Sequence, residues 1–204
     1  MASPVGEEVK SSALLLLDYQ AGYFERVPGA EILFAPGFDD LPAHVASVRR
    51  QAKAAGVQIV YIDTGFRPGH PEIAGSPSAG HQMVRANGLF VLGSPEQEFQ
   101  PDLRPDPDDV TIVKHRWGGF SGTDLDQILR ANGIRTIVLA GIATSGSVLT
   151  TLRTGVDLDY RVVVLADCCR DADEEKQRVL LEKIFPSQAT VTTSEAWLAS
   201  LSAG

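Results

Sequence analysis

The chain is poor in cysteine, since its 204 residues include only Cys168 and Cys169, which are adjacent. Adjacent cysteines have poor geometry for an ordinary disulfide, and two thiols are too few for a structural zinc site. The pair therefore indicates a reducing compartment. Both follow a predicted strand, so a thiol nucleophile is one interpretation. We expect instead that one packs under a sheet as a small apolar residue and the other lies at its rim.

The chain also lacks an apolar run long enough to span a bilayer, and residues 1–10 do not have the basic and apolar pattern of a signal peptide. We expect a cytoplasmic protein with no membrane partner and a flexible N-terminus over residues 1–10. The net charge of −8, with scattered lysines and arginines, argues against nucleic acid as a partner. A content of 44% hydrophobic and 22% charged residues predicts one domain over residues 1–204.

Short apolar runs alternate with amphipathic segments along the chain, and this order predicts a parallel sheet. Because crossover helices bury such strands on both faces, we predict a three-layer α/β/α doubly wound (Rossmann-like) fold with a mainly parallel sheet of about six strands. Residues 66–105, rich in Pro, Gly and polar residues, are expected to flank the cleft at the strand ends. The predicted strands are 13–17, 57–62, 110–114, 136–140, 161–166 and 189–192, and the predicted helices are 41–55, 123–132, 145–154, 173–184 and 194–201.

The most informative stretch is the turn 141–148, with the sequence GIATSGSV, which follows a predicted strand and opens a helix. Unpaired amide N–H groups of a first helical turn can hold negative charge that develops beside Ser147. Gly141 and Gly146 have the glycine spacing of a phosphate-binding P-loop, but Ser147 and Val148 stand where that loop needs Lys and a hydroxyl. The turn therefore predicts a nucleophile beside an oxyanion site rather than a nucleotide site.

Three polar residues follow three predicted strands: Asp18, Lys114 and, one helical turn further on, Ser147. The carboxyl ends of parallel strands share one edge of the sheet, so these side chains are expected to meet there. Asp18 can then accept a proton from Ser147, while Lys114 stabilises the ionised carboxylate. The alternative is a structural Asp–Lys ion pair with Ser147 as an ordinary helix N-terminal residue.

Three separated motifs in this order resemble those of the isochorismatase-like hydrolases, also called the cysteine hydrolase superfamily. They are LLLLDYQ at 14–20, VKHRWGGF at 113–120 followed by GTDL at 122–125, and LAGIATSGSV at 139–148. The resemblance runs from about residue 14 to 173. Members include nicotinamidases, N-carbamoylsarcosine amidohydrolases, other amide and ureide hydrolases, and isochorismatases. The resemblance implies a small-molecule substrate and a homo-oligomer, with the helix 145–154 partly in a subunit contact.

The resemblance also implies the roles of individual residues. Asp18 matches the catalytic Asp, Lys114 matches the catalytic Lys, and Ser147 stands at the position of the nucleophilic Cys. Members commonly have a cis peptide that corresponds to Ile142–Ala143 here. The backbone N–H groups of Ala143 and Ser147 would then form the oxyanion hole.

Serine in place of cysteine leaves four interpretations open. Ser147 is a slow nucleophile with Asp18 as base, or Asp18 acts as an acid without covalent catalysis, as in isochorismatases with Gly at this position. Alternatively, the site is inactive, or the serine is an engineered replacement of Cys. A serine hydroxyl needs a well-placed base, and the only His in the matching motifs, His115, is predicted to point away from Lys114.

The motif that binds zinc in nicotinamidases has an Asp and two His, whereas residues 63–71 here contain one His. We therefore predict no metal and no other cofactor. Phe66, Arg67 and His70 are interpreted as one wall of the substrate pocket, in which Arg67 can bind a substrate carboxylate. The alternative is that these residues form a solvated loop without a role in binding. The aromatic residues near the strand ends line the cleft or belong to the core. The residues predicted to contact substrate are Gln20, Phe24, Phe66, Arg67, His70, Trp117, Phe120 and Thr144.

Together these observations predict a hydrolase that cleaves a C–N bond of a small amide or ureide through an acyl-enzyme at position 147. The second interpretation is hydrolysis of a vinyl ether, with Asp18 as the acid. The third is a catalytically silent homologue that binds a ligand in the same pocket.

Overall fold

The computed structural model describes residues 9–24 and 40–202 of the chain. The N-terminal segment 1–10 is predicted to be flexible, and residues 1–8 of it lie outside the described residues. Most predicted bounds agree with the structure to within two residues. The main elements are β1 (Ser12–Leu17), α2 (Ala21–Phe24), α3 (Leu41–Ala54), β2 (Gln58–Thr64), α4 (Ala79–Ala86), β3 (Val110–Lys114), α5 (Leu125–Ala131), β4 (Thr136–Ile142), α6 (Leu149–Asp157), β5 (Arg161–Arg170), α7 (Glu174–Val179), β6 (Thr190–Thr192) and α8 (Ser194–Ser202).

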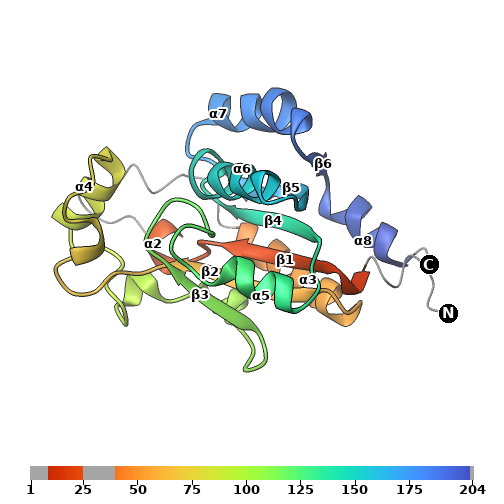
Figure 1. Cartoon of the computed structure of the whole chain (residues 1–204), viewed down its shortest axis with the longest axis horizontal. Coiled ribbons are helices and arrows are strands. Elements are labelled where there is room, and N and C mark those ends of the chain that lie inside the picture. The colour runs from red at the N-terminus through yellow and green to blue at the C-terminus, as the bar shows by residue number, and fades with distance from the viewer. Residues whose placement is uncertain (1–8, 25–39, 203–204) are drawn as a thin grey trace.

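The six strands form one sheet in the order β3-β2-β1-β4-β5-β6, and every neighbouring pair is parallel (Figure 1). The chain winds outward in one direction from β1 to β3 and in the other from β4 to β6. This topology confirms the predicted doubly wound α/β fold. The strand order reverses between β1 and β4, which is where ligands bind in open sheets of this kind.

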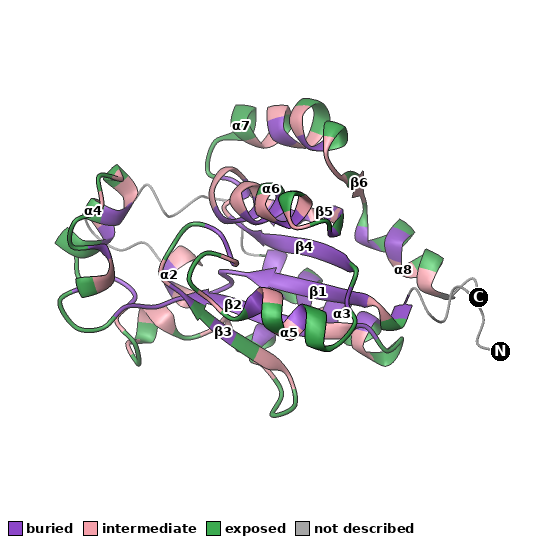
Figure 2. Ribbon diagram, in the orientation of Figure 1, coloured by how far each residue is buried: buried purple, intermediate pink, exposed green. Residues whose placement is uncertain are grey.

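The sheet is covered on both faces, which explains its continuous apolar strands (Figure 2). Leu14 and Leu16 of β1 face α3 and α8, whereas Leu15 and Leu17 face α5, α6 and the π-helical segment η6 (Leu180–Ile184). Alternate residues of one strand thus serve two separate cores. No helix within the described ranges is long and apolar enough to cross a lipid bilayer.

Residues 66–105 form the predicted excursion, which contains α4 and three short 3-10 helices: η2 (Pro71–Ile73), η3 (Pro95–Gln97) and η4 (Pro101–Leu103). It has a small apolar core of its own, to which Phe66 and Phe90 contribute. The Phe66 N–H donates to the carbonyl of Phe90 over 2.9 Å, which ties the start of the excursion to its middle. In Figure 1, α4 lies beyond the end of the sheet toward which the β1 arrow points.

Strand β5 is longer than predicted and contains an irregularity. Val164 pairs with Leu139 of β4, but the next paired residue of β5 is Cys169, opposite Gly141. Five steps along β5 therefore match two steps along β4. Such a bulge bends the strand and resets which side chains face which side of the sheet.

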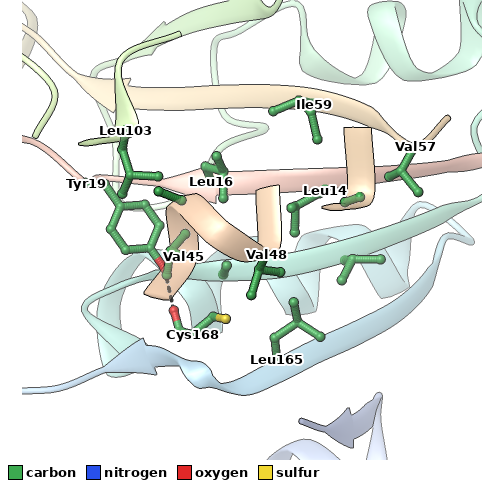
Figure 3. Close-up of a cluster of buried hydrophobic side chains, with 14 of the residues drawn as sticks. Leu14, Leu16, Tyr19, Val45, Val48, Val57, Ile59, Leu103, Leu165 and Cys168 are labelled. Atoms are coloured by element: carbon green, nitrogen blue, oxygen red, sulfur yellow. Dashed lines mark hydrogen bonds between the residues drawn. The ribbon is translucent and has the colours of Figure 1, made fainter. Parts of the chain in front are cut away.

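The bulge decides where the two cysteines lie. Cys168 packs with Leu165 against α3, and its carbonyl accepts a hydrogen bond from the Tyr19 hydroxyl (Figure 3). Cys169 lies in the core on the opposite face. Both are fully buried, so the expectation that one thiol lies at the rim is wrong. Burial raises the pKa of both thiols, that of Cys169 to about 12, which argues against either as a nucleophile.

We expect neither thiol to react with a disulfide reagent such as Ellman's reagent in the native protein, because the reactive thiolate is absent from both buried positions at about pH 8. In the denatured chain both cysteines should react with the reagent, and this measurement provides the control. Rapid reaction of a thiol in the native state would show that the core around β5 is more open than described.

Candidate active site

A buried ion pair lies at the carboxyl ends of the strands. The Lys114 Nζ lies 2.9 Å from the Asp18 Oδ2, and both side chains are almost fully buried. Thr64 joins the two residues, because its hydroxyl donates to the Asp18 Oδ1 over 2.9 Å and accepts from the Lys114 Nζ over 2.8 Å. Asp18 thus has two partners, and Lys114 has a third in the carbonyl of Arg116, over 3.2 Å. Burial of an ion pair requires such additional partners.

The sheet explains this arrangement. Asp18 directly follows β1, Thr64 ends β2 and Lys114 ends β3, and these are three adjacent strands. Thr64 is paired with Lys114 in the register of β2 and β3. The Asp18 backbone has φ +59°, in the left-handed region that costs non-glycine residues energy and is common at functional sites. The strand ends therefore hold three side chains of one network.

Gln20 secures the middle member of this network. Its Nε2 donates to the Thr64 carbonyl over 2.7 Å, and its Oε1 accepts from the Thr64 N–H over 2.8 Å. The same Nε2 donates to the carbonyl of Gln97, whose side chain in turn donates to the Asp63 Oδ2. Gln20 therefore positions Thr64, and through it Asp18, rather than contacting substrate.

Asp63 is a second buried carboxylate near the ion pair. Burial raises its pKa to about 6, and the nearby charge of Asp18 adds to this effect, whereas the hydrogen bond from Gln97 opposes it. The Asp63 Oδ1 has no hydrogen-bond partner among the described residues. Ionisation of Asp63 therefore destabilises the folded state.

Ser147 lies in the π-helical segment η5 (Thr144–Val148), directly after β4. The Ile142–Ala143 peptide bond is cis, and the Ala143 carbonyl accepts from the N–H groups of Gly146 and Val148, over 3.0 and 3.3 Å. The Ser147 Oγ is buried and makes no hydrogen bond within the described part of the chain. An unpaired buried hydroxyl costs about 1–3 kcal/mol, so it needs a reason to persist.

One small cavity, of about 90 Å³, brings these groups together. Asp18, Lys114, Thr64 and Ser147 all line it. Two of the residues that were predicted to contact substrate, Phe66 and Trp117, form apolar walls of this cavity. The remaining lining residues are Tyr23, Gly80, His81, Val84, Arg116, Ile142, Ala143 and Ala172. A mostly apolar cavity with a few convergent polar groups is typical of a small-molecule site.

Trp117 forms the wall between the excursion and the Ser147 turn. Its indole stacks on the His81 ring, with 5.4 Å between the ring centroids and 17° between the planes. A Cβ added at Gly80 would lie 2.7 Å from this indole, and one added at Gly146 would lie 3.2 Å from it. Burial, and to a lesser extent the cations Arg116 and Lys114, lower the pKa of His81 below its ordinary value, which favours the neutral ring.

The other predicted contact residues lie outside the cavity lining. Arg67 is exposed and pairs with Glu72 over 2.7 Å. The His70 Nε2 contacts the carbonyl of Leu89 over 2.7 Å. These bonds hold the excursion together and occupy the groups that were expected to meet the substrate.

The remaining corrections concern core residues. Phe120 stacks on Tyr160, at 5.8 Å between ring centroids, beneath α5 and α6. Phe24 packs against the α3 core. The Thr144 side chain is fully buried in the turn, and its hydroxyl has no partner among the described residues. For Phe24 and Phe120, the alternative interpretation as core aromatics fits their positions.

Sequence reasoning missed Thr64, Tyr23, His81 and Arg116. Thr64 had a detectable signal, because Asp63 and Thr64 are polar residues at the end of a strand that pairs with β1. Arg116 lies in the quoted motif 113–120, but its direction is set by a loop rather than by a strand period. Tyr23 and His81 lie in short helices that no sequence pattern predicted.

The donors present do not fit the zinc site that some resembling proteins have. The ring of His70 is engaged by Leu89, and Asp63 is engaged by Gln97. Among the described residues, two groups of three potential metal-binding side chains lie elsewhere. One of them, Asp106, Asp108 and Asp109, is already paired with cations: the Lys53 Nζ lies 2.7 to 2.9 Å from each carboxylate, and Arg49 also pairs with Asp106 and Asp109. The other is His44, Asp167 and Cys168.

Similarity to known proteins agrees with this geometry. The isochorismatase domain family matches residues 12–196. The chain belongs to this family. A relative of this isochorismatase-family chain, the ureidoacrylate amidohydrolase RutB of Stutzerimonas stutzeri, is 31% identical, and the match covers 98% of this chain and 86% of that protein.

Solved structures agree with this assignment. A cysteine hydrolase from Pseudomonas syringae pv. phaseolicola has a TM-score of 0.83 and 26% identity, and the match covers 99% of both chains. The N-carbamoylsarcosine amidase from Thermoplasma acidophilum has a TM-score of 0.71 and 26% identity, over 91% of this chain and 97% of that one. The isochorismatase-family chain is therefore a hydrolase.

We expect Thr64→Val to lower the free energy of unfolding by about 1–3 kcal/mol, because Asp18 and Lys114 each lose a buried partner. Thr64→Ser keeps the hydroxyl and is the matched control, with a loss of less than about 1 kcal/mol. Urea denaturation followed by circular dichroism measures both values. A loss of stability in Thr64→Ser but not in Thr64→Val would mean that the methyl group, and not the hydroxyl, matters.

Asp63→Asn should stabilise the protein in a pH-dependent manner. The folded-state pKa of Asp63, about 6, exceeds the ordinary 3.8, so the folded protein binds more protons between these values and loses stability as the pH rises through them. The variant should therefore match the parent near pH 4 and exceed it by roughly 1–3 kcal/mol above pH 7. A gain of the same size at every pH would contradict this account.

Proposed function

We propose that this hydrolase cleaves a C–N bond of a small amide or ureide through an acyl-enzyme on Ser147. The observation that carries the proposal is the Ser147 hydroxyl, which is buried, unpaired among the described residues, and part of the same cavity as the Asp18–Lys114 ion pair. A carbonyl carbon in this cavity would meet a nucleophile and a proton acceptor together.

In the first half of the reaction the Ser147 Oγ attacks the carbonyl carbon, and its proton passes to the Asp18 carboxylate. The C–N bond then breaks as Asp18 returns this proton to the leaving nitrogen, which departs as ammonia or an amine. Lys114 keeps Asp18 charged and oriented throughout, because an adjacent cation favours the ionised carboxylate. The product on the enzyme is an ester of Ser147.

Water completes the cycle. Asp18 takes a proton from the attacking water, the ester bond breaks, and Ser147 regains its proton. In both halves the carbonyl oxygen becomes an anion, for which the backbone N–H groups of Ala143 and Ser147 are the proposed donors. Donors fixed in a turn need no rearrangement as the charge develops.

The relatives support a C–N substrate. RutB is named for the hydrolysis of ureidoacrylate, and the Thermoplasma protein for N-carbamoylsarcosine. A cavity of about 90 Å³ supports a small substrate. Together they support a small amide or ureide as the chemical class of the substrate.

Serine makes this chemistry slow. A thiol is partly ionised near pH 7, whereas a serine hydroxyl depends on its base at the moment of attack. No hydrogen bond joins the Ser147 Oγ to Asp18 in the described structure, so substrate binding has to bring them into contact. The expected activity is therefore low, and a thiol at position 147 should raise it.

Ammonia release from a panel of small amides and ureides tests the proposal. We expect Ser147→Cys to raise the rate by about tenfold or more over the parent, because thiolate is the better nucleophile. Asp18→Asn removes the proton acceptor and should abolish release in both backgrounds. Circular dichroism and thermal unfolding confirm that each variant is folded.

The outcomes separate the three interpretations. Ammonia from the Cys form, but not from the Asn form, supports a covalent amidase. Hydrolysis of a vinyl ether substrate at a rate that depends on Asp18 and not on residue 147 would favour acid catalysis instead. Thermal stabilisation by a ligand without any turnover would favour a silent binding protein.

A further inference from the structure

One cluster of metal-binding side chains lies outside the active site and takes no part in the proposed reaction. It consists of His44 of α3 with Asp167 and Cys168 of β5. One imidazole nitrogen, one carboxylate oxygen and the thiol sulfur all lie within 4.8 Å of one another. Both β5 residues fall in the bulge between Val164 and Cys169. Consecutive residues of a regular strand point to opposite faces, and a bulge allows two of them to approach the same helix.

The carboxylate of this cluster is held in place. The Asp167 Oδ1 accepts from the Ser194 N–H over 2.8 Å, and the Oδ2 accepts from the Ser194 hydroxyl over 2.6 Å. The His44 Nε2 lies 3.0 Å from the same Oδ2. Hydrogen bonds of this kind orient the ligands of metal sites in proteins. Ser194, at the start of α8, therefore acts as a support for the cluster.

The cluster can be reached from solvent on one side. A groove of about 370 Å³ lies between α3 and α8, and both His44 and Ser194 line it. The His44 side chain is 43% exposed and that of Asp167 is 33% exposed, whereas Cys168 is fully buried behind them. A metal ion can thus enter from the groove and meet the thiol at its inner end. The thiol proton leaves to solvent as the ion binds, because the ligand is the thiolate.

The donor types select the ion. Mg²⁺ and Ca²⁺ prefer oxygen ligands, whereas imidazole and thiolate together suit Zn²⁺. Zinc bonds of about 2.0 to 2.3 Å in a tetrahedron place donors about 3.3 to 3.6 Å apart, which is close to the spacing of these three atoms. A carboxylate and a thiolate also neutralise the two charges of the ion. A water molecule from the groove can complete the tetrahedron.

The acidic cluster Asp106, Asp108 and Asp109 lacks these properties, because Lys53 and Arg49 already pair with its carboxylates. The sequence predicted no metal on two grounds: two thiols are too few for a structural zinc site, and residues 63–71 contain one His. Neither ground considers a mixed donor set that the fold assembles from distant segments.

We propose that His44, Asp167 and Cys168 bind one Zn²⁺ ion, which joins α3 to β5 and stabilises the packing of α3 and α8 on the sheet. None of the three residues lines the cavity that contains Ser147. The site is therefore independent of the proposed reaction, and its test needs no substrate.

Titration of the reduced protein with Co²⁺, a spectroscopic substitute for Zn²⁺, tests the thiolate ligand. We expect a sulfur-to-cobalt charge-transfer band in the near ultraviolet that saturates at one equivalent and disappears when Zn²⁺ is added. Cys168→Ala should abolish the band. Cys169→Ala removes the adjacent buried thiol on the opposite face and is the matched control, in which the band should persist. Metal bound at the all-oxygen acidic cluster gives no such band.

Calorimetry with Zn²⁺ tests the other two contacts. His44→Gln alters a half-exposed side chain, so the variant should fold, and it should raise the Kd by about 100-fold or more, since loss of a ligand's hydrogen-bond partner alone changes metal affinity about 10- to 100-fold. Ser194→Ala should raise the Kd by about tenfold. Zinc should also raise the Tm of the parent but not that of His44→Gln.

Three results would overturn the proposal: no charge-transfer band with Co²⁺ in the folded parent, a band that persists in Cys168→Ala, or equal affinity of the parent and His44→Gln for Zn²⁺. The cluster would then be only a hydrogen-bonded link between α3, β5 and α8. Circular dichroism of each variant confirms that the comparison is made between folded proteins.

Discussion

The site depends on one buried ion pair between Asp18 and Lys114. Two charges removed from water are costly unless each has close partners, and an unpaired member would cost several kcal/mol. Thr64 supplies the second partner of both, and Gln20 holds the Thr64 backbone from two sides. The pair therefore links the ends of three adjacent strands into one network, and the cavity is built around it.

The parts of the molecule that could be predicted from sequence are those that the sheet determines. Continuous apolar runs indicate buried parallel strands, and the ends of such strands share one edge, so Asp18, Lys114 and Ser147 could be brought together without a structure. Thr64 follows from the same argument once β2 is extended to its last residue. The strand bounds failed mainly in β5, because a bulge has no signal in an apolar run.

The cavity lining outside the sheet could be predicted only in part, for a physical reason. Residues 66–105 have no regular period, so the direction of each side chain depends on hydrogen bonds formed far along the chain. Arg67 illustrates this, since its side chain is exposed and pairs with Glu72, five residues further along the excursion. The strand ends thus place Asp18, Thr64 and Lys114, and less regular segments supply much of what surrounds them.

The contact of Trp117 with Gly80 and Gly146 restricts how this chain can diverge. A side chain at position 80 would displace the indole, and with it a wall of the cavity, whereas one at position 146 would press on the indole less closely, from 3.2 Å. Gly69 and Gly88, in the same excursion, have open space where a side chain would extend, although both have positive φ. Substitutions that accumulate over evolution are thus constrained sterically at positions 80 and 146. The absence of a side chain at Gly80 and at Gly146 leaves room for the Trp117 indole in the cavity wall.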